Sequence, residues 1–432
     1  MVGRRHPLFN ASFWKRFQSD QPMQQDVQGK VDSRAMREVN RSIVLDIIRR
    51  GGKVSRTDLA KRSTLTKPTV SAIVDDLIAR GIVQEVGFGK TVATGGRRAR
   101  LLEFNDASAA YLGLRFGVHT TTVAIADARG EVRVIKEAEA VAGDPHASVR
   151  SALALLDGAL EEAGLPRSRL QSVGVTVPGM VDSRQGTVAF APNLGWNDVP
   201  IRALLQQALE LPVVVHNVTS SGAIAEGRVG AAKGARSYVW VYVGHGLGAG
   251  IVIDGQLFSG TKGFSGEIGH CPVVDDGPLC SCGLRGCLET LASGKAIERI
   301  AAEAARGSEP TRLSLHDAPF DASVVLDAAR AGDAVAQRIL RGVGEHLGVG
   351  LSYLINVLDP ELLVLGGRVM EAGDYILEGA RASVARHTLR SSKVEVVSST
   401  LGDRAGLIGS VISAMDQAVR SYRIVSTAER LA

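Results

Sequence analysis

The sequence predicts a winged helix-turn-helix over residues 34–104, followed by an α/β body over residues 105–432 that divides into two lobes. Three observations lead to this prediction. Residues 34–104 show helical periods separated by a short turn, strand and helix patterns alternate from Tyr111 onward, and the sign of the net charge changes between the two parts. Residues 1–33 show no sustained period, and we interpret them as a flexible arm.

The predicted head begins with a helix that ends at residues 51–52, a Gly-Gly pair. A second, short helix starts at Ser55, because Ser55 and Asp58 have the spacing of a capping box. Residues 64–66 form the turn, and Thr66 caps a third helix. The apolar residues of that helix recur at helical spacing and give it one buried face: Val70, Ile73, Val74, Leu77 and Ile78.

The opposite face of the third helix is polar, and two short strands follow at residues 82–86 and 100–104 with a basic loop between them. In a winged head of this kind the third helix enters the major groove of DNA, and a basic wing tip enters the adjacent minor groove. We therefore expect DNA contacts from Lys67, Thr69, Ser71, Arg97 and Arg98. A small helical protein-interaction domain is the alternative.

The charge of the chain is divided unevenly. Of the 50 Lys/Arg and 45 Asp/Glu residues, residues 1–104 hold 20 and 10, and the remainder holds 30 and 35. A basic head on a mildly acidic body favours a nucleic-acid partner. No stretch approaches the roughly 18 apolar residues of a membrane helix, and the basic N-terminus lacks the apolar segment of a secretory signal. We expect a cytoplasmic protein with no membrane partner.

Strand patterns in the body alternate with helical ones, which is typical of an α/β fold. The predicted strands are residues 111–114, 121–125, 172–177, 211–216, 238–243, 249–253 and 362–365, and residues 149–163 have a helical period. About 320 residues is long for one core of this kind, so the sequence predicts two lobes. The helix at residues 345–358 is apolar on one face, which serves either a subunit interface or the core.

The four cysteines are clustered: all lie between Cys271 and Cys287, directly after His270. A secreted chain of this length would spread its cysteines among disulfides. The cluster predicts a metal site in a reducing compartment instead.

From about Met36 the chain resembles the ROK family (repressors, open reading frames and sugar kinases), through the motifs Gly266-Glu267-Ile268-Gly269-His270 and Cys280-Ser281-Cys282-Gly283-Leu284-Arg285-Gly286-Cys287-Leu288-Glu289. The resemblance implies a body with the two-lobed, actin-like ATPase fold of the sugar kinases, and the winged head places the chain with the repressor branch.

The resemblance also implies a structural Zn²⁺ near residues 263–289, held by His270, Cys280, Cys282 and Cys287. Three thiolates and one imidazole suit a tetrahedral zinc ion. Cys271 has no counterpart in the family. It could compete with His270 for the metal, but we favour a small buried neighbour, because adjacent side chains in an extended segment point apart.

A sugar site follows from the same resemblance, with five contact residues: Asn193, Asn217, Glu267, His270 and Glu289. Carboxylate, amide and imidazole groups suit sugar hydroxyls, because each hydroxyl both donates and accepts hydrogen bonds. A metal on one ring nitrogen of His270 would leave the other facing the sugar. The structural alternative for these polar residues is turn formation and helix capping.

The chain departs from the family's kinases at the reacting positions. The kinases have Asp after the residue that corresponds to Asn217, as the base for the sugar hydroxyl, and Val218 cannot accept a proton. Arg115 replaces an acidic residue of the first phosphate motif, and His245 replaces a Thr of the second. The Leu-Gly-Gly run at residues 365–367 keeps the adenosine-side signature. We therefore predict no catalytic residues and no enzyme activity.

Together these patterns predict a DNA-binding transcriptional regulator, a repressor, of sugar-metabolism genes that responds to a carbohydrate effector. We expect a homodimer or higher homo-oligomer, because paired heads read a palindromic operator. Two alternatives remain: an ATP-dependent sugar kinase with a regulatory head, and a repressor controlled by a protein partner instead of a sugar.

Overall fold

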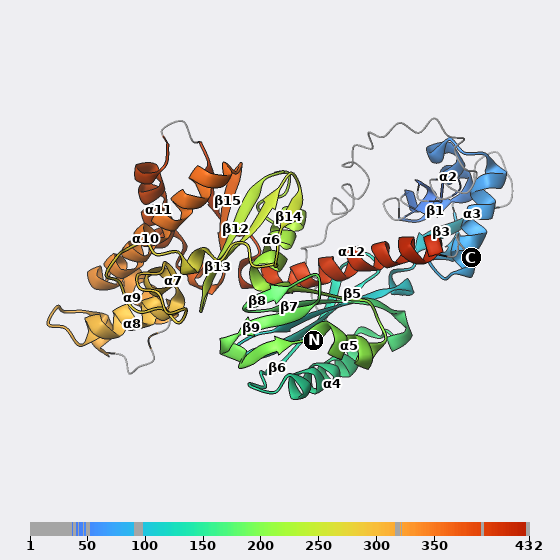
Figure 1. The fold of residues 1–432 in the computed structure, drawn as a ribbon. Coiled ribbons are helices and arrows are strands. Elements are labelled where there is room, and N and C mark those ends of the chain that lie inside the picture. Colours follow the sequence, from blue (N-terminus) through green and yellow to red (C-terminus); the bar gives the residue numbers. More distant parts are fainter. Residues whose placement is uncertain are drawn as a thin grey trace. The chain divides into compact units, whose positions relative to one another are not determined.

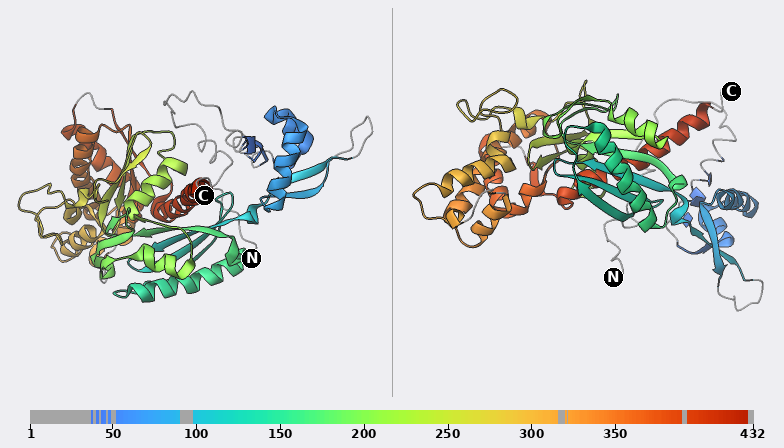
Figure 2. Two further views of the ribbon diagram at one scale, coloured as in Figure 1. Left: turned by 45° about the vertical axis from the view of Figure 1, so that its right-hand side comes forward. Right: turned by 90° about the horizontal axis from the view of Figure 1, so that it is seen from below.

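The computed structural model describes residues 37, 40, 41, 43–45, 47, 48, 52–89, 98–315, 320, 322–389 and 393–428. Contacts between Cα atoms divide the chain into two compact units. One unit comprises Met1–Ala110 together with Ala126–Arg133 and Ala163–Leu170, and the other comprises Tyr111–Ile125, Val134–Glu162 and Gln171–Ala432. Figure 1 and Figure 2 show the helices and strands of each unit.

The head contains α2 (Arg56–Ser63), α3 (Lys67–Ala79) and a small antiparallel sheet in the order β1-β3-β2, formed by Val54–Ser55, Arg100–Phe104 and Val83–Phe88. The predicted capping box is confirmed, since the Ser55 hydroxyl accepts the Asp58 N–H at 3.2 Å and Asp58 accepts the Ser55 N–H at 3.3 Å. The predicted cap of α3 is also confirmed. Apolar side chains from the helices and the sheet form one core: Val44, Ile48, Val54, Leu59, Val70, Ile73, Val74, Leu77, Val83, Leu102 and Phe104.

The turn between β5 (Thr120–Asp127) and β6 (Val132–Glu139) belongs to the same compact unit as the head. Asp106, just after β3, forms ion pairs with Arg129 and Arg133 on that turn. The Ala128 N–H donates to the Asp106 carbonyl at 3.0 Å, and the Arg129 guanidinium lies 5.4 Å from the centre of the Phe104 ring. These contacts attach the turn to the end of the winged helix.

The first lobe of the body is a five-stranded sheet in the order β11-β7-β4-β5-β6. Its strands are β4 (Ala110–Phe116), β5 (Thr120–Asp127), β6 (Val132–Glu139), β7 (Leu170–Val177) and β11 (Val213–Asn217). The helices α4 (Pro145–Ala163) and α5 (Ile201–Leu209) lie against one face of the sheet, and α12 (Ala405–Ala428) lies against the other (Figure 1, Figure 2). A small antiparallel sheet adjoins it, formed by β8 (Met180–Asp182), β9 (Thr187–Ala191) and β10 (Trp196–Val199).

The second lobe is built on a mixed sheet in the order β14-β13-β12-β15-β16. Its strands are β12 (Tyr238–Val243), β13 (Leu247–Ile253), β14 (Gln256–Phe258), β15 (Leu362–Gly366) and β16 (Glu395–Ser398). Helix α6 (Val218–Val229) lies on one side of this sheet, and the remaining helices gather on the other (Figure 1). They are α7 (Glu289–Ala292), α8 (Gly294–Ala305), α9 (Ala322–Arg330), α10 (Ala334–Leu358) and α11 (Gly373–His387).

Short 3-10 helices join these elements: η2 (Asp106–Ser108), η3 (Arg167–Arg169), η4 (Pro192–Leu194), η5 (Ile268–His270), η6 (Arg312–Leu315), η7 (Arg368–Ala372) and η8 (Gly402–Arg404). Among the described residues, none of the helices is both long and apolar enough to cross a membrane.

The apolar face predicted at residues 345–358 belongs to α10 and is buried in the second lobe, through Leu347, Leu351, Leu354 and Ile355. The structure therefore decides the open alternative in favour of the core. The predicted strands of the body agree with the observed ones to within two residues at each end. The predicted helix at residues 149–163 lacked its first turn, which begins at Pro145.

Helices α6 and α12 cross with their backbones in contact. A Cβ atom placed on Gly409 of α12 would lie 1.8 Å from the Ser221 carbonyl oxygen of α6. At the next residue of α12, the Ser410 carbonyl oxygen would lie 1.8 Å from a Cβ atom placed on Gly174 of β7. The Thr176 hydroxyl donates to the Gly406 carbonyl at 3.1 Å. No side chain fits between these elements, because their backbones are already in van der Waals contact.

We expect Gly409→Ala and Gly174→Ala each to lower the free energy of unfolding by roughly 1–3 kcal/mol, because the added methyl group must push two backbones apart. Gly342→Ala is the matched control: Gly342 lies within α10, and its Cβ atom would meet nothing within 4 Å. That control should gain up to about 1 kcal/mol from helix propensity. Urea titrations followed by circular dichroism measure all three, and a Gly409→Ala protein as stable as the Gly342→Ala protein would contradict the crossing.

Candidate functional site

A cluster of sulfur and nitrogen atoms lies in the second lobe. The ligand atoms of His270, Cys280, Cys282 and Cys287 all lie within 4.8 Å of one another. The Cys282 and Cys287 Sγ atoms are 3.7 Å apart, and the Cys280 Sγ atom is 3.5 Å from His270 Nδ1. A tetrahedron with Zn–S bonds of about 2.3 Å and a Zn–N bond of about 2.0 Å has edges of about 3.8 Å and 3.5 Å. The spacing of the four groups therefore fits a zinc ion.

Glycine turns bring the cysteines together. Gly283 and Gly286 have φ values of +91° and +69°, in the region that favours glycine. A Cβ atom on Gly286 would lie 1.7 Å from the Val274 carbonyl oxygen, so the chain must pass close to itself here. The pairing of Pro272 with Cys287 then places His270, at the end of η5, beside the last cysteine.

Cys271 is not part of this cluster. Its side chain is half-buried and packs against the apolar core of the second lobe. The structure thus favours the second of the two predicted roles for Cys271, the small buried neighbour. Burial raises the pKa of the Cys287 thiol to about 12, and the sulfurs of Cys282 and Cys280 add to the effect. Three sulfurs this close repel one another as thiolates, so a cation favours their ionised form.

Two carboxylates lie beside His270. Burial raises the pKa of Glu267, the His270 ring acts in the opposite direction, and the charge of Glu289 raises it further. The Glu289 Oε2 atom accepts the Leu247 N–H at 3.0 Å, which fixes this carboxylate against the start of β13. Because His270 Nδ1 faces the Cys280 sulfur, its Nε2 atom is the one left for a ligand. Three of the five predicted sugar contacts are therefore brought together.

The two asparagines have other partners in the structure. The Asn217 Oδ1 atom caps α6, accepting the Ser220 N–H at 2.8 Å and the Thr219 hydroxyl at 3.1 Å. The Oδ1 atom of Asn217 therefore serves as a helix cap, which is the structural alternative to ligand binding given above. A ligand would be contacted through the Nδ2 atom of Asn217. Asn193 is exposed on η4, and its Oδ1 atom accepts the Lys295 ammonium at 3.4 Å. The structure does not show either asparagine in contact with Glu267 or Glu289.

An ion pair and an aromatic ring lie near the turns that correspond to the phosphate motifs. The Arg115 guanidinium binds the Asp403 carboxylate through two nitrogens, at 3.1 Å and 3.3 Å. Beside this pair, burial and the Asp403 charge raise the pKa of Tyr242 to about 12. The Tyr242 ring lies where a side chain on Gly244 or Gly367 would be, 2.4 Å and 2.9 Å from their Cβ positions. Gly244 and Gly367 therefore leave room for a ring of the protein itself.

The tips of two hairpins from different sheets meet. The His119 ring, after β4, and the His245 ring, after β12, are edge-on with their centres 6.0 Å apart. The sequence patterns predict no role for His119, Lys295, Tyr242 or Asp403, since these residues are up to 284 positions apart in the chain and meet only in the fold. The signal that could have found the histidines is their place in two glycine-containing turns between strands.

The predicted DNA-contact residues of α3 lie along its solvent side. Lys67 is exposed, and Thr69 and Ser71 are half-buried. Arg56 of α2 donates to the Ser71 carbonyl and to the Asp75 carboxylate, which holds the two helices together. Arg98 is exposed before β3, and Arg97 lies outside the described residues. This arrangement suits a helix that enters a groove by its N-terminal end.

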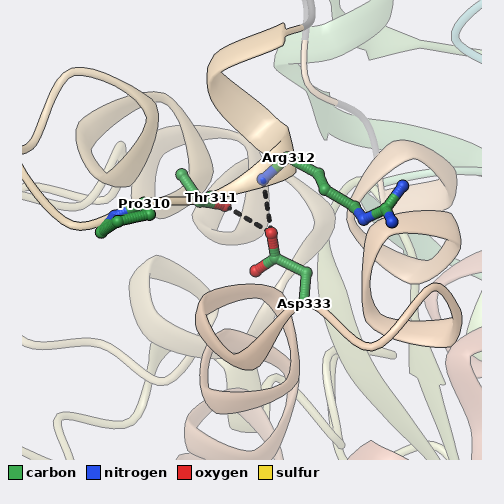
Figure 3. Close-up of a pocket in the computed structure, with 4 residues that line it drawn as sticks. All are labelled: Pro310, Thr311, Arg312 and Asp333. Atoms are coloured by element: carbon green, nitrogen blue, oxygen red, sulfur yellow. Dashed lines mark hydrogen bonds between the residues drawn. The ribbon is translucent and has the colours of Figure 1, made fainter.

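One surface depression in the described part of the chain is lined by Pro310, Thr311, Arg312 and Asp333 (Figure 3). The Asp333 carboxylate stabilises the local fold, because it accepts the Thr311 hydroxyl at 2.9 Å and the Ala336 N–H at 2.9 Å, and the latter bond caps α10. Since these bonds use the acceptor atoms of Asp333, the depression is a capping arrangement and not a candidate ligand site.

Comparisons with known proteins agree with this geometry. A model of the ROK family matches residues 111–417, and a model of the MarR family matches residues 38–90. A xylose repressor of Caldicellulosiruptor bescii is 34% identical over 383 residues, which cover 87% of this chain and 95% of that repressor.

Two solved structures extend the likeness to the fold. A ROK family transcriptional regulator, a homologue of the E. coli MLC protein, matches with a TM-score of 0.73 at 27% identity over 90% of this chain and 99% of its own. A ROK family glucokinase from Streptomyces griseus, in complex with glucose and AMPPNP, matches with a TM-score of 0.64 at 32% identity over 71% of this chain and 100% of its own. The predicted fold class, a winged head followed by a two-lobed sugar-kinase body, is confirmed.

We expect the purified protein to carry one Zn²⁺ per chain. Cys282→Ser should lose the ion and destabilise the second lobe, because the binding free energy of a structural metal contributes to folding. Cys271→Ser is the matched control and should keep the ion, since its sulfur packs against the core. Elemental analysis of dialysed protein measures the content. Zinc lost from Cys271→Ser but retained in His270→Ala would show that the fourth ligand is Cys271.

Proposed function

This chain belongs to the ROK family, and on that premise we propose that it is a transcriptional repressor of sugar-metabolism genes whose body binds a carbohydrate effector. One observation carries the proposal: a basic winged head and a body with the Glu267–His270–Glu289 cluster occur in one chain, and that chain matches a xylose repressor over 95% of the repressor's length. The head supplies affinity for operator DNA, and the body supplies a response to a sugar.

We propose that Glu267, His270 and Glu289 bind the sugar hydroxyls, with Asn217 and Asn193 as further contacts. The two carboxylates accept hydrogen bonds, and the amide and imidazole N–H groups donate them. His270, Cys280, Cys282 and Cys287 would hold the zinc ion, which neutralises the thiolates and fixes the orientation of the His270 ring. In this arrangement the metal is structural and takes no part in a reaction.

The site supports binding without phosphoryl transfer. Val218 follows Asn217 and has no group that accepts a proton. Arg115 is already paired with Asp403. The likeness to a glucokinase keeps a sugar kinase with a regulatory head as the second candidate. An assay that couples ADP production to NADH oxidation separates the two: we expect no turnover with ATP and any hexose, and saturable turnover would establish the kinase.

We place the boundaries of the domains at residues 1–33, 34–104 and 105–432, and the protein in the cytoplasm with its DNA. A dimer would present two heads to the two halves of a palindromic operator. The sugar changes DNA affinity only if it binds one conformation of the protein more tightly than another. A thermal-shift screen that finds no stabilising sugar would favour the third candidate, a repressor controlled by a protein partner.

Replacing Arg97 and Arg98 with Ala should weaken operator binding, because these residues belong to the basic wing tip. The slope of log affinity against log salt should become less steep by about 0.9 for each phosphate that the protein no longer neutralises. Arg150 and Arg330, exposed on α4 and α9, provide a control that removes the same charge from the body. Gel-shift titrations at several salt concentrations measure both pairs. Equal losses of operator affinity in the two double variants would show that the wing tip does not contact the DNA.

Glu267→Ala should weaken sugar binding by about 10- to 100-fold, because a hydrogen bond to a charged group contributes roughly 1.5–3 kcal/mol. The variant should still bind operator DNA, but sugar should no longer alter that binding at concentrations that act on the parent. Glu378→Ala removes an exposed carboxylate of α11 and serves as the control. Calorimetry and gel shifts on one preparation test both properties. Parent-like affinity and response in Glu267→Ala would place the sugar elsewhere.

A further inference from the structure

Two imidazoles from separate sheets converge at one point of the body. His119 lies at the tip of the β4–β5 hairpin, whose turn is closed by the Gly117 N–H donating to the Thr120 carbonyl at 2.8 Å. His245 lies at the tip of the β12–β13 hairpin, closed by the Gly244 N–H donating to the Gly246 carbonyl at 2.9 Å. With ring centres 6.0 Å apart, both imidazoles can reach one small ligand between or beside them.

Lys295 adds an ammonium group to the two imidazoles. It lies in the first turn of α8, which Ser293 caps by accepting the Ala296 N–H at 3.3 Å. The Gly294 N–H donates to the Gly244 carbonyl at 2.7 Å, which fixes the start of α8 against the turn that carries His245. The position of Lys295 beside the histidines is therefore built into the backbone. The positive end of the α8 dipole adds to the local potential.

The three groups have no anionic partner of their own. Lys295 Nζ donates to a neutral amide oxygen, Asn193 Oδ1, at 3.4 Å. Within the described part of the chain, no carboxylate forms an ion pair with His119, His245 or Lys295. Arg115 on the same hairpin differs, because Asp403 neutralises it. Burial lowers the pKa of His245, and Lys295 and His119 lower it further. The His245 ring therefore loses its proton more readily than a free imidazole when no anion is bound.

The cluster adjoins the proposed sugar contacts. The Glu289 carboxylate lies against Gly246, the residue that follows His245 in the β12–β13 turn. A Cβ atom on Gly246 would be 2.9 Å from Glu289 Oε2. Glu289 also accepts the Leu247 N–H, so its position relative to His245 is fixed by the backbone. One ligand of the size of a sugar derivative could contact Glu289 through a hydroxyl group and His245 through another substituent.

We propose that His119, His245 and Lys295 form a subsite for an anionic group of the effector, which is therefore a phosphorylated or carboxylate-bearing sugar. The inference rests on the proposed function, since it names the chemical class of the ligand bound there. A phosphate and a carboxylate share the chemistry that the subsite recognises, a compact anion with several acceptor oxygens. The subsite distinguishes such a sugar from its neutral parent, because only an anion gains from the charge of the Lys295 ammonium and favours the charged form of the His245 ring.

Anion binding is coupled to proton uptake. His119 on the β4–β5 turn and Lys295 on α8 act on the pKa of His245, and the Glu289 carboxylate of α7 lies against the adjacent residue Gly246. In the free protein the pKa of His245 is lowered, so its ring is neutral near pH 7. A bound anion favours the charged ring and raises this pKa. Affinity is therefore highest at low pH and falls as the pH rises through the pKa of the bound state.

Sulfate is a suitable probe for the subsite alone, because it does not titrate near neutral pH. The full-length protein is titrated with sulfate against chloride at constant ionic strength, while the Cε1–H signals of His119 and His245 are followed by NMR. We expect a saturable shift of both signals, and weaker binding as the pH is raised. Lys295→Met should weaken sulfate binding at least tenfold, whereas Lys295→Arg and the control Lys136→Met, which removes a lysine paired with Glu162, should retain it.

Matched sugars test the effector class by calorimetry. Glucose, galactose and mannose are each compared with their 6-phosphates and their uronates. For the sugar that binds, an anionic form should bind at least tenfold more tightly than the neutral one, and the phosphate and uronate arms distinguish the two sources of charge. The advantage should disappear in the triple variant His119→Gln, His245→Gln, Lys295→Met. A neutral sugar that binds as tightly as its anionic forms would overturn the subsite.

The two proposals fail in different ways. If a neutral sugar binds through Glu267 while sulfate gives no saturable shift, the sugar sensor stands and the anionic subsite is wrong. If sulfate binds and Lys295→Met abolishes it, but no sugar of any charge binds, the subsite stands and the sugar-sensing function is wrong. If neither sulfate nor an anionic sugar shows binding that depends on Lys295, the inference is overturned.

Discussion

The contact on which the rest of the body depends is the backbone crossing of α6 and α12. The chain leaves the first lobe through α6, directly after β11, and returns to it through α12 after β16. Gly409 lets the two helices meet at Ser221, and Gly174 lets α12 lie on the sheet at Ser410. Both passages between the lobes are therefore held at one place, where backbone packs on backbone and no flexible side chain intervenes. The groups that come from different lobes, such as Arg115 and Asp403, are positioned from there.

The residues that stand at the expected points of departure from the family's kinases make contacts that the fold uses. Arg115 and Asp403 satisfy each other through two hydrogen bonds, and the Tyr242 ring fills the space beside Gly244 and Gly367. A partly buried pair of this kind is costly only when one partner is missing. The His270 ring meanwhile joins the cysteine cluster to the two carboxylates, so the proposed metal site and the proposed sugar contacts share one side chain.

Local patterns in the sequence were sufficient for much of this fold. The capping box of Ser55 and Asp58 spans four residues, so their spacing alone predicts it. The cysteines cluster within residues 271–287, which predicts a metal site, whereas the set of four ligands follows from the family resemblance. Strand β1 has only two residues, which is too short to show a pattern. The pairing of His119 with His245 depends on two sheets meeting, and no periodicity contains that information. Asn217 shows a different limit of the sequence. An asparagine is suited both to a helix cap and to a ligand contact, so the residue type alone does not distinguish the two roles.

The β4–β5 hairpin has a mechanical consequence. Its strands run without interruption between the turn that holds His119 and the compact unit of the winged helix, which includes Ala110 at the start of β4 and Ala126–Arg133 after β5. Strands held in the middle of a sheet are stiff along their length, since shortening one would break the hydrogen bonds to both neighbours. The turn that holds His119 is therefore connected to the neighbourhood of the Asp106–Arg129 ion pair by two continuous strands, with no loop along either of them.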